Sequence, residues 1–141
     1  MKAVVISFLG SVHKVDVQEN GEPLYAQIRS VIGGYMENTY PKNLPDDYIM
    51  IVNEEGKLNR LPVNTIATIV YGSDVDFIVG NTIILKFGKF EGESDVVGMT
   101  EEEADNIMAC IHQEIIKNKK ARLVEEDEQD ATHSADSNLH N

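Results

Sequence analysis

The side chains of this sequence that could do chemistry are few and widely spaced. Asp74 and Asp76 place two carboxylates on the same side of an extended chain, where they could hold Mg²⁺ with a phosphate group; such acidic pairs are also common in solvated loops. Cys110 falls beside an apolar helical stripe, which favours a buried structural thiol over a nucleophile. The four histidines show no HxH or HExxH spacing, and a single cysteine allows no CxxC pair. We therefore expect no metal site, no cofactor and no catalytic residues.

Several polar residues in the middle of the chain could form a binding site. Asn53 and Gly56 are explained by the geometry of a turn, whereas Glu37, Glu55 and Asn64 are not required by it. A polar trio placed by two strands and a helix start could contact a ligand. It could equally be a buried network, in which Asn64 caps a helix and the glutamates accept backbone N–H groups.

Tyrosines and arginines accompany these polar residues in the sequence. Tyrosine combines an aromatic ring that can stack with a polar hydroxyl group. Four of the five tyrosines lie in this part of the sequence: Tyr35, Tyr40, Tyr48 and Tyr71. With basic side chains near them they could line a pocket for a planar anionic ligand, or they could pack on the sheet. We predict a ligand-binding set made of Arg29, Tyr35, Glu37, Asn53, Glu55, Arg60 and Asn64.

Hydrophobic patterns predict the elements that position these residues in the first half of the chain. Residues 2–8 and 13–18 indicate a β-hairpin. Residues 23–32 carry apolar side chains at helical spacing, and the glycines at 33–34 are typical of a helix end. Residues 35–40 indicate a strand, after which prolines and acids indicate a loop.

The next segments alternate strands with turn chemistry. Residues 48–52 indicate a strand, and the NEEG turn that follows predicts a returning antiparallel strand at 57–61. Residues 65–72 are either a short helix capped by Asn64 or a strand, since Ile, Thr and Val favour β structure. Residues 77–88 indicate β structure with a bend at Gly80-Asn81.

The clearest element is a helix over residues 99–122. Thr100 and Glu103 form a capping box, acidic residues follow at its start, and basic residues lie at its end. We predict a single α+β domain over residues 1–122, with helices on a mostly antiparallel sheet. Residues 123–141 are acidic and poor in apolar groups, which predicts a disordered tail.

The net charge of −12 is distributed unevenly along the chain. Residues 123–141 carry six acidic side chains and no basic ones, which is half of the imbalance. The rest of the chain lacks the clustered Lys and Arg that binding to a phosphate backbone requires, so nucleic acid is not expected as a partner. No stretch is long and apolar enough to span a bilayer, and one cysteine suits a reducing compartment. We expect a cytoplasmic protein without membrane contact.

Three blocks together resemble a known family: VIGGYMENTYP, MIVNEEGKLNRLPVNTIAT and DFIVGNTIIL. The positions that carry the resemblance are Gly33, Gly34, Tyr35 and Glu37, then Asn53 to Leu58, Leu61, Pro62, Asn64 and Ala67, and finally Ile78 and Gly80. The set is similar to domain of unknown function 3846, a family of small proteins from phages and mobile elements of Gram-positive bacteria. The resemblance covers roughly residues 1–88. It implies a phage or prophage origin but no reaction.

These features together predict a non-enzymatic phage-type accessory protein that acts against a host defence or regulatory system. In its sharpest form it binds and sequesters a small nucleotide-like signal. The alternative is a protein-interaction inhibitor of a host enzyme, in which the acidic charge could imitate DNA. An enzyme that uses Glu37, Glu55 or Asp76 as acid or base is a third hypothesis. Edge strands also predict a homo-oligomer.

Overall fold

The computed structural model describes the backbone of residues 1–140 and the side chains of residues 1–125. Its elements are, in chain order, β1 (Lys2–Ile6), β2 (Val12–Asp16), α1 (Gly21–Ile32), β3 (Met36–Thr39), β4 (Tyr48–Asn53), α2 (Thr65–Tyr71), β5 (Thr82–Phe90), β6 (Glu93–Val97) and α3 (Glu101–His140). No helix in the described part of the chain is long and apolar enough to cross a membrane.

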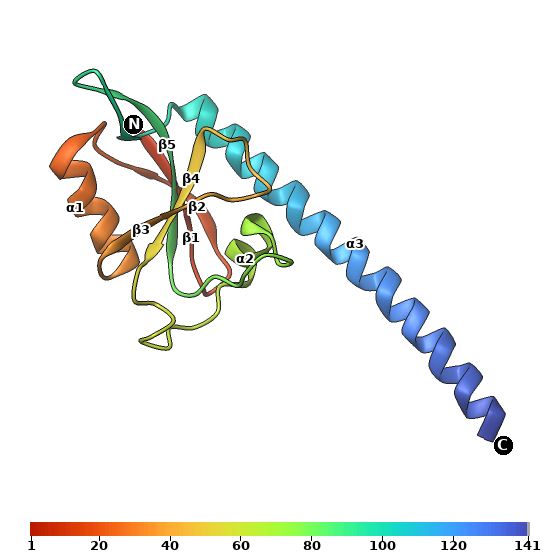
Figure 1. Cartoon of the computed structure of the whole chain (residues 1–141). Coiled ribbons are helices and arrows are strands. Elements are labelled where there is room, and N and C mark those ends of the chain that lie inside the picture. Colours follow the sequence, from red (N-terminus) through yellow and green to blue (C-terminus); the bar gives the residue numbers. More distant parts are fainter. Residues whose placement is uncertain (141) are drawn as a thin grey trace.

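The strands form one antiparallel sheet in the spatial order β2-β1-β5-β4-β3, and β6 also pairs with β5 (Figure 1). Lys86 of β5 pairs with Tyr48 of β4 on one side and with Val97 of β6 on the other. β6 and β1 therefore lie along the same edge of β5. The predicted α+β fold, with its mostly antiparallel sheet and its two amphipathic helices, is confirmed.

Helices cover both faces of the sheet, with α1 on one side and α2 and α3 on the other (Figure 1). Because successive strand residues point to opposite faces, Val4 and Ile6 pack with α2 and α3, whereas Ala3 and Val5 pack with α1. All four side chains are buried. A strand covered on both faces is apolar along its buried part, which explains the continuous apolar runs AVVI in β1 and IMIV in β4.

The helices of the first seventy residues confirm two local predictions. α1 ends where Gly33, at φ 78°, donates its N–H to the carbonyl oxygen of Arg29 at 2.8 Å. Residues 65–72, for which the sequence allowed either a helix or a strand, contain the helix α2. The N–H of Ala67 donates to Oδ1 of Asn64 at 3.0 Å, which is the predicted cap.

The strand predicted at residues 57–61 is wrong. These residues form consecutive turns, in which the N–H of Leu61 donates to the carbonyl oxygen of Gly56 at 3.0 Å and Arg60 adopts φ 54°. β4 has no edge for a returning strand, because β3 occupies one edge and β5 the other. β5 begins at Thr82, later than predicted, and turns at two residues of positive φ into β6, a strand that the sequence pattern does not predict.

α3 begins with the predicted capping box. Oγ1 of Thr100 accepts the N–H of Glu103 at 3.2 Å, and Oε1 of Glu103 accepts the N–H of Thr100 at 3.0 Å. The helix continues through residues 123–125, which the sequence analysis assigned to the disordered acidic tail at 123–141. Good helix formers such as Ala, Arg, Leu and Glu explain this continuation. The rest of the predicted tail lies outside the residues whose side chains are described.

Candidate functional site

A cavity of about 230 Å³ lies on the α2 side of the sheet, at the edge formed by β3 and β4. Glu37 of β3 and Val52 of β4 stand opposite each other in the sheet, and both line it. Val52 also belongs to the apolar cluster beneath α2, which places the cavity on that face. The lining comes from β3, β4, the turns after β4, and α2 with the segment after it: Glu37, Thr39, Val52, Asn53, Glu54, Lys57, Tyr71, Asp76, Phe77, Ile78 and Val79.

The turns after β4 form one wall of the cavity. The N–H of Gly56 donates to the carbonyl oxygen of Asn53 at 3.0 Å. The N–H of Glu54 donates to the carbonyl oxygen of Tyr35 at 2.9 Å. The side chain of Asn53 fixes the turn, because its Oδ1 accepts the N–H of Glu55 at 2.9 Å. Its Nδ2 donates to the last carbonyl oxygen of α1 at 3.3 Å. Both polar atoms of this side chain are therefore bonded to the backbone.

The segment after α2 forms the opposite wall, and an ion pair joins it to the turns. Nζ of Lys57 lies 2.7 Å from both carboxylate oxygens of Asp76 and 4.3 Å from the centroid of the Phe77 ring. Lys57 and, after it, the N–H of Phe77 hold the pKa of Asp76 below its usual value. The paired side chains are 48% and 46% exposed, so the pair adds little stability and serves mainly to position the two walls.

The cavity is rich in hydrogen-bond acceptors. Its lining includes three acidic residues, Glu37, Glu54 and Asp76, and one basic residue, Lys57, which already pairs with Asp76. Apolar and aromatic side chains complete the lining: Val52, Tyr71, Phe77, Ile78 and Val79. A ligand that fits this surface combines a flat apolar body with N–H donors.

A family model described as Domain of unknown function (DUF3846) matches residues 1–112. The chain belongs to the DUF3846 family. The match runs from β1 into the packed first part of α3, beyond the residue near 88 at which the resemblance in the sequence ended. No curated protein and no solved structure matches this DUF3846 chain. Its function therefore has to be inferred from its residues.

The DUF3846 fold brings part of the predicted site to the cavity. Glu37 and Asn53 line it. The side chain of Tyr35 is 69% exposed, and its carbonyl oxygen accepts the N–H of Glu54 in the turn. Glu55 is exposed beside the same turn, where its N–H donates to Asn53. β3 and β4 thus bring Glu37 and Asn53 to the cavity, whereas Tyr35 and Glu55 lie outside its lining.

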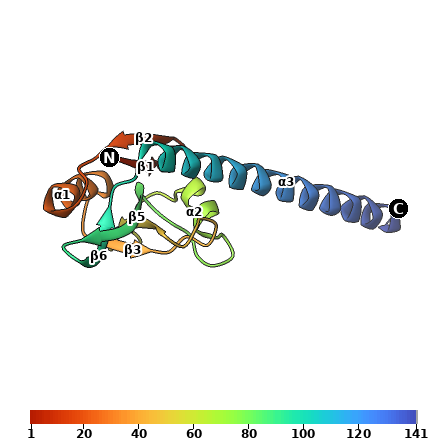
Figure 2. The ribbon, with the colours of Figure 1, turned by 90° about the horizontal axis from the view of Figure 1, so that it is seen from above.

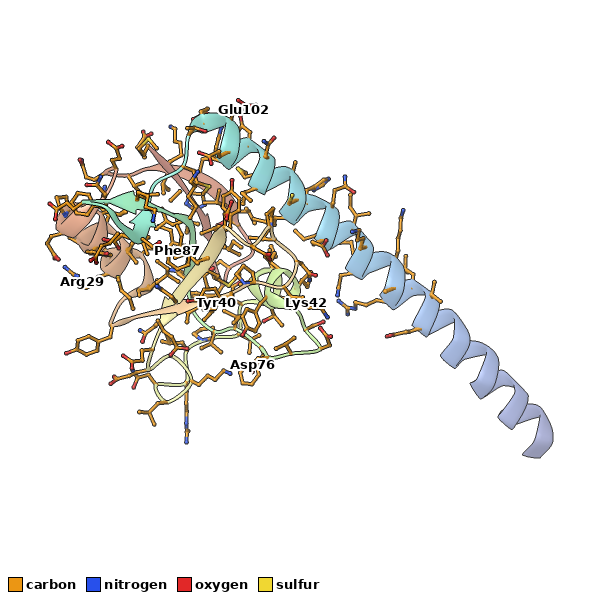
Figure 3. All side chains as sticks on the ribbon, turned by 45° about the horizontal axis from the view of Figure 1, so that its top comes forward. Arg29, Tyr40, Lys42, Asp76, Phe87 and Glu102 are labelled. Carbon is orange, nitrogen blue, oxygen red and sulfur yellow. The ribbon has the colours of Figure 1, made fainter. Side chains whose placement is uncertain are left out.

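The two arginines of the predicted set lie elsewhere in the DUF3846 fold. Arg29 belongs to α1, on the opposite face of the sheet, where it pairs with Glu22; Figure 3 shows it well apart from Asp76. Arg60 is exposed at the end of the turns and does not belong to the lining. Neither guanidinium is placed to neutralise an anion in the cavity.

Asn64 forms the buried network that the sequence left as an alternative. Its side chain is fully buried, and Nδ2 donates to the carbonyl oxygens of Ile6 at 2.9 Å and Gly80 at 2.8 Å. Because Oδ1 accepts the N–H of Ala67, every polar atom of the amide is bonded within the fold. Asn64 therefore joins α2 to β1 and to the entrance of β5.

Asp74 and Asp76 do not act as one pair of carboxylates. Oδ2 of Asp74 lies 2.7 Å from Nζ of Lys42, whereas Asp76 pairs with Lys57. Each lysine lowers the pKa of its own partner. Within the described side chains, no group of three His, Cys, Asp or Glu residues is placed to hold a metal ion.

The tyrosines are divided between the cavity and the sheet. Tyr71 lines the cavity, while the ring of Tyr40 stacks on Phe87 with 6.2 Å between centroids (Figure 3). The hydroxyl of Tyr48 donates to Oε2 of Glu103 at 3.4 Å, and its pKa is raised by burial and by that carboxylate. Of the four tyrosines singled out in the sequence, only Tyr71 lines the cavity.

Sequence reasoning missed Glu54 and Phe77 as cavity residues. The turn at residues 53–56 was explained by its backbone alone, and Phe77 was assigned to a strand. A usable signal was present, since opposite charges at Lys57 and Asp76 can join two loops across a short distance.

Proposed function

We propose that this DUF3846 chain is a non-enzymatic accessory protein of phage type, which counteracts a host defence or regulatory system by sequestering a small nucleotide-like signal. The observation that carries the proposal is the cavity of about 230 Å³, in which acceptor groups surround an apolar and aromatic surface. Small-molecule sites typically combine such a surface with a few fixed polar groups. Sequestration requires tight binding without turnover.

The base is the part of a nucleotide-like ligand that suits the cavity. Its ring can pack against Tyr71 and Phe77, while its N–H groups donate to the carboxylates of Glu37 and Glu54. A phosphate would meet these carboxylates, and Lys57 is already neutralised by its ion pair. We therefore propose that the base enters and that any phosphate stays in solvent at the mouth.

Thermal denaturation with a panel of nucleosides, nucleotides and cyclic nucleotides tests this function. A ligand at roughly a hundredfold excess over its Kd stabilises the native state by about 2.7 kcal/mol, which raises the Tm. Glu37→Gln should reduce the rise, because it removes a carboxylate of the cavity. Glu93→Gln changes an exposed strand glutamate outside the cavity and should not. A flat panel contradicts sequestration.

A second candidate function is direct inhibition of a host enzyme through protein–protein contact. It is favoured by apolar side chains exposed beside the Lys57–Asp76 pair, where Leu58 is 80% exposed and Val75 60%. Exposed apolar groups in a polar rim are typical of interaction surfaces, and acidic surroundings also suit imitation of DNA.

The two candidates make different predictions for one substitution. If protein contact is the function, Leu58→Ser should abolish inhibition of the host system. Any rise in Tm that a ligand causes in the wild type should be unchanged in this variant. Leu9→Ser changes a residue that is 83% exposed on the β1–β2 turn and is the matched control. If sequestration is the function, neither serine variant should affect inhibition.

A further inference from the structure

The far part of α3 has no packing partner among the described residues. Ala104, Ile107 and Ile111 are buried, but every side chain from residue 119 to residue 125 is exposed. These include Leu123 and Val124, which are 60% and 57% exposed. Figure 2 shows α3 extending away from the rest of the fold. A helix without tertiary packing is only marginally stable in water, so a contact with a partner would stabilise this extension.

Two of the four basic residues in this part of α3 lack an acidic partner on their own helix, whereas Lys117 pairs with Glu114 and Arg122 lies three and four residues before Glu125 and Glu126. Lys119 and Lys120 have no acidic residue three or four positions away in either direction, so neither can form the usual ion pair along α3. Lys117 and Lys120 are like charges three residues apart, as are Lys119 and Arg122, and such pairs destabilise a helix. An opposite charge from outside α3 would relieve this repulsion.

An acidic block follows the basic one directly, since residues 125–136 contain six acidic residues and no basic one. Two parallel copies of α3 would set the basic block against itself, whereas two antiparallel copies set each basic block against the acidic block of the other. We propose that α3 docks antiparallel onto α3 of a second copy of this chain. The two-fold axis lies near Leu123 and Val124, and residues 119–120 face residues 125–128 of the other copy.

An apolar groove continues the proposed surface toward the sheet. Its volume is about 290 Å³, and its lining includes Val12, Ile66, Met108, His112 and Ile115. Positions 108, 112, 115, 119 and 122 follow at intervals of four and three residues, so the groove and the basic block share one face of α3. The proposed contact surface of α3 therefore extends from the basic block to this groove.

The mass of the full chain in solution tests the proposal. At about 0.1 M salt, light scattering should give twice the chain mass of 15.7 kDa. At about 1 M salt the Debye length falls from about 10 Å to about 3 Å, so the mass should fall toward that of one chain. Lys119→Glu/Lys120→Glu should be monomeric at low salt. Lys89→Glu, an exposed lysine on the β5–β6 hairpin, is the control and should remain dimeric.

Mixing two variants separates charge pairing from misfolding. Glu126→Lys/Asp127→Lys should also be monomeric alone, because the new lysines then face the basic block of the other copy. An equimolar mixture with Lys119→Glu/Lys120→Glu should restore the dimer, since each block then faces its opposite. A single cooperative thermal transition shows that the domain of each variant is folded, although loss of the dimer should lower its Tm. A mixture that stays monomeric contradicts the proposal.

Disulfide trapping tests the antiparallel orientation. In a Cys110→Ser background, Leu123→Cys lies near the two-fold axis and should cross-link readily. Lys119→Cys should not, because antiparallel copies separate the two residues by about 13 Å along the helix axis, beyond the reach of a disulfide. A single-chain mass at low salt, a dimer untouched by Lys119→Glu/Lys120→Glu, or equal cross-linking at both positions overturns the proposal.

Discussion

The ammonium of Lys57 lies 2.7 Å from both carboxylate oxygens of Asp76, a residue nineteen positions further along the chain. The contact joins the turns after β4 to the segment after α2, and so it connects the two walls of the cavity. It also neutralises the positive charge of Lys57. The cavity is therefore left with carboxylates that accept hydrogen bonds and with no uncompensated cation in its lining.

Replacing Asp76 by asparagine should change ligand preference more than stability. The substitution removes a carboxylate and releases Lys57, so the affinity for a nucleoside monophosphate should rise relative to that for its nucleoside, by about fivefold. The free energy of unfolding should change by less than about 1 kcal/mol, because the pair is exposed. Asp74→Asn breaks the similar pair with Lys42 outside the cavity. Calorimetric titrations that give the same preference for both variants contradict the assigned role of Asp76.

Removing the amide of Asn64 should destabilise the fold strongly. Asn64→Ala leaves the carbonyl oxygens of Ile6 and Gly80 and the N–H of Ala67 without their bonds in a buried site. The expected loss in the free energy of unfolding is about 2–4 kcal/mol. Urea denaturation measures it, and Asn59→Ala, on the exposed turn, is the control that should stay near the wild type. A small loss at position 64 would show that water replaces the network.

The ion pair between Glu103 and Lys86 should make stability depend on acid pH. Oε2 of Glu103 lies 2.5 Å from Nζ of Lys86, and this lysine, followed by the N–H of Thr100, holds the pKa of Glu103 below its usual 4.5. Because the folded pKa is lower than the unfolded one, the stabilisation is fully present above pH 4.5. It is lost as the pH falls through the folded pKa.

Urea denaturation from about pH 5 to about pH 3 checks this dependence. Glu103→Gln should lower the free energy of unfolding by about 1 kcal/mol near neutral pH and flatten its fall in acid. Glu102→Gln, at an exposed neighbouring position, should retain the wild-type slope (Figure 3). Identical slopes for the two variants would assign the acid sensitivity to other carboxylates.

The parts of the fold that could be predicted from the sequence are those decided within a few residues. The cap of α2 joins Asn64 to Ala67, and the capping box of α3 joins Thr100 to Glu103, so each is visible as a short spacing. The end of α1 depends on Gly33 alone. Local chemistry of this kind is the same wherever the segment lies in the fold.

The features that could not be predicted depend on partners distant in sequence. Residues 57–61 fail to pair with β4 because β5, which begins at Thr82, occupies the edge that they would need. β6 was missed since only its last two residues, Val96 and Val97, are apolar, which is too short a run to indicate a strand. Arg29 was assigned to the site, although α1 covers the other face of the sheet, and only the topology reveals which face a helix covers.

The central claim, that the cavity holds a small ligand without converting it, is tested most directly by native mass spectrometry. The full chain is incubated with the panel of nucleosides, nucleotides and cyclic nucleotides, and bound molecules are released and weighed. We predict one ligand per chain, released with unchanged mass, with occupancy reduced in Glu37→Gln and retained in Glu93→Gln. A chain that binds nothing in the panel, or a ligand that is released chemically altered by the wild type but not by Glu37→Gln, would contradict the claim.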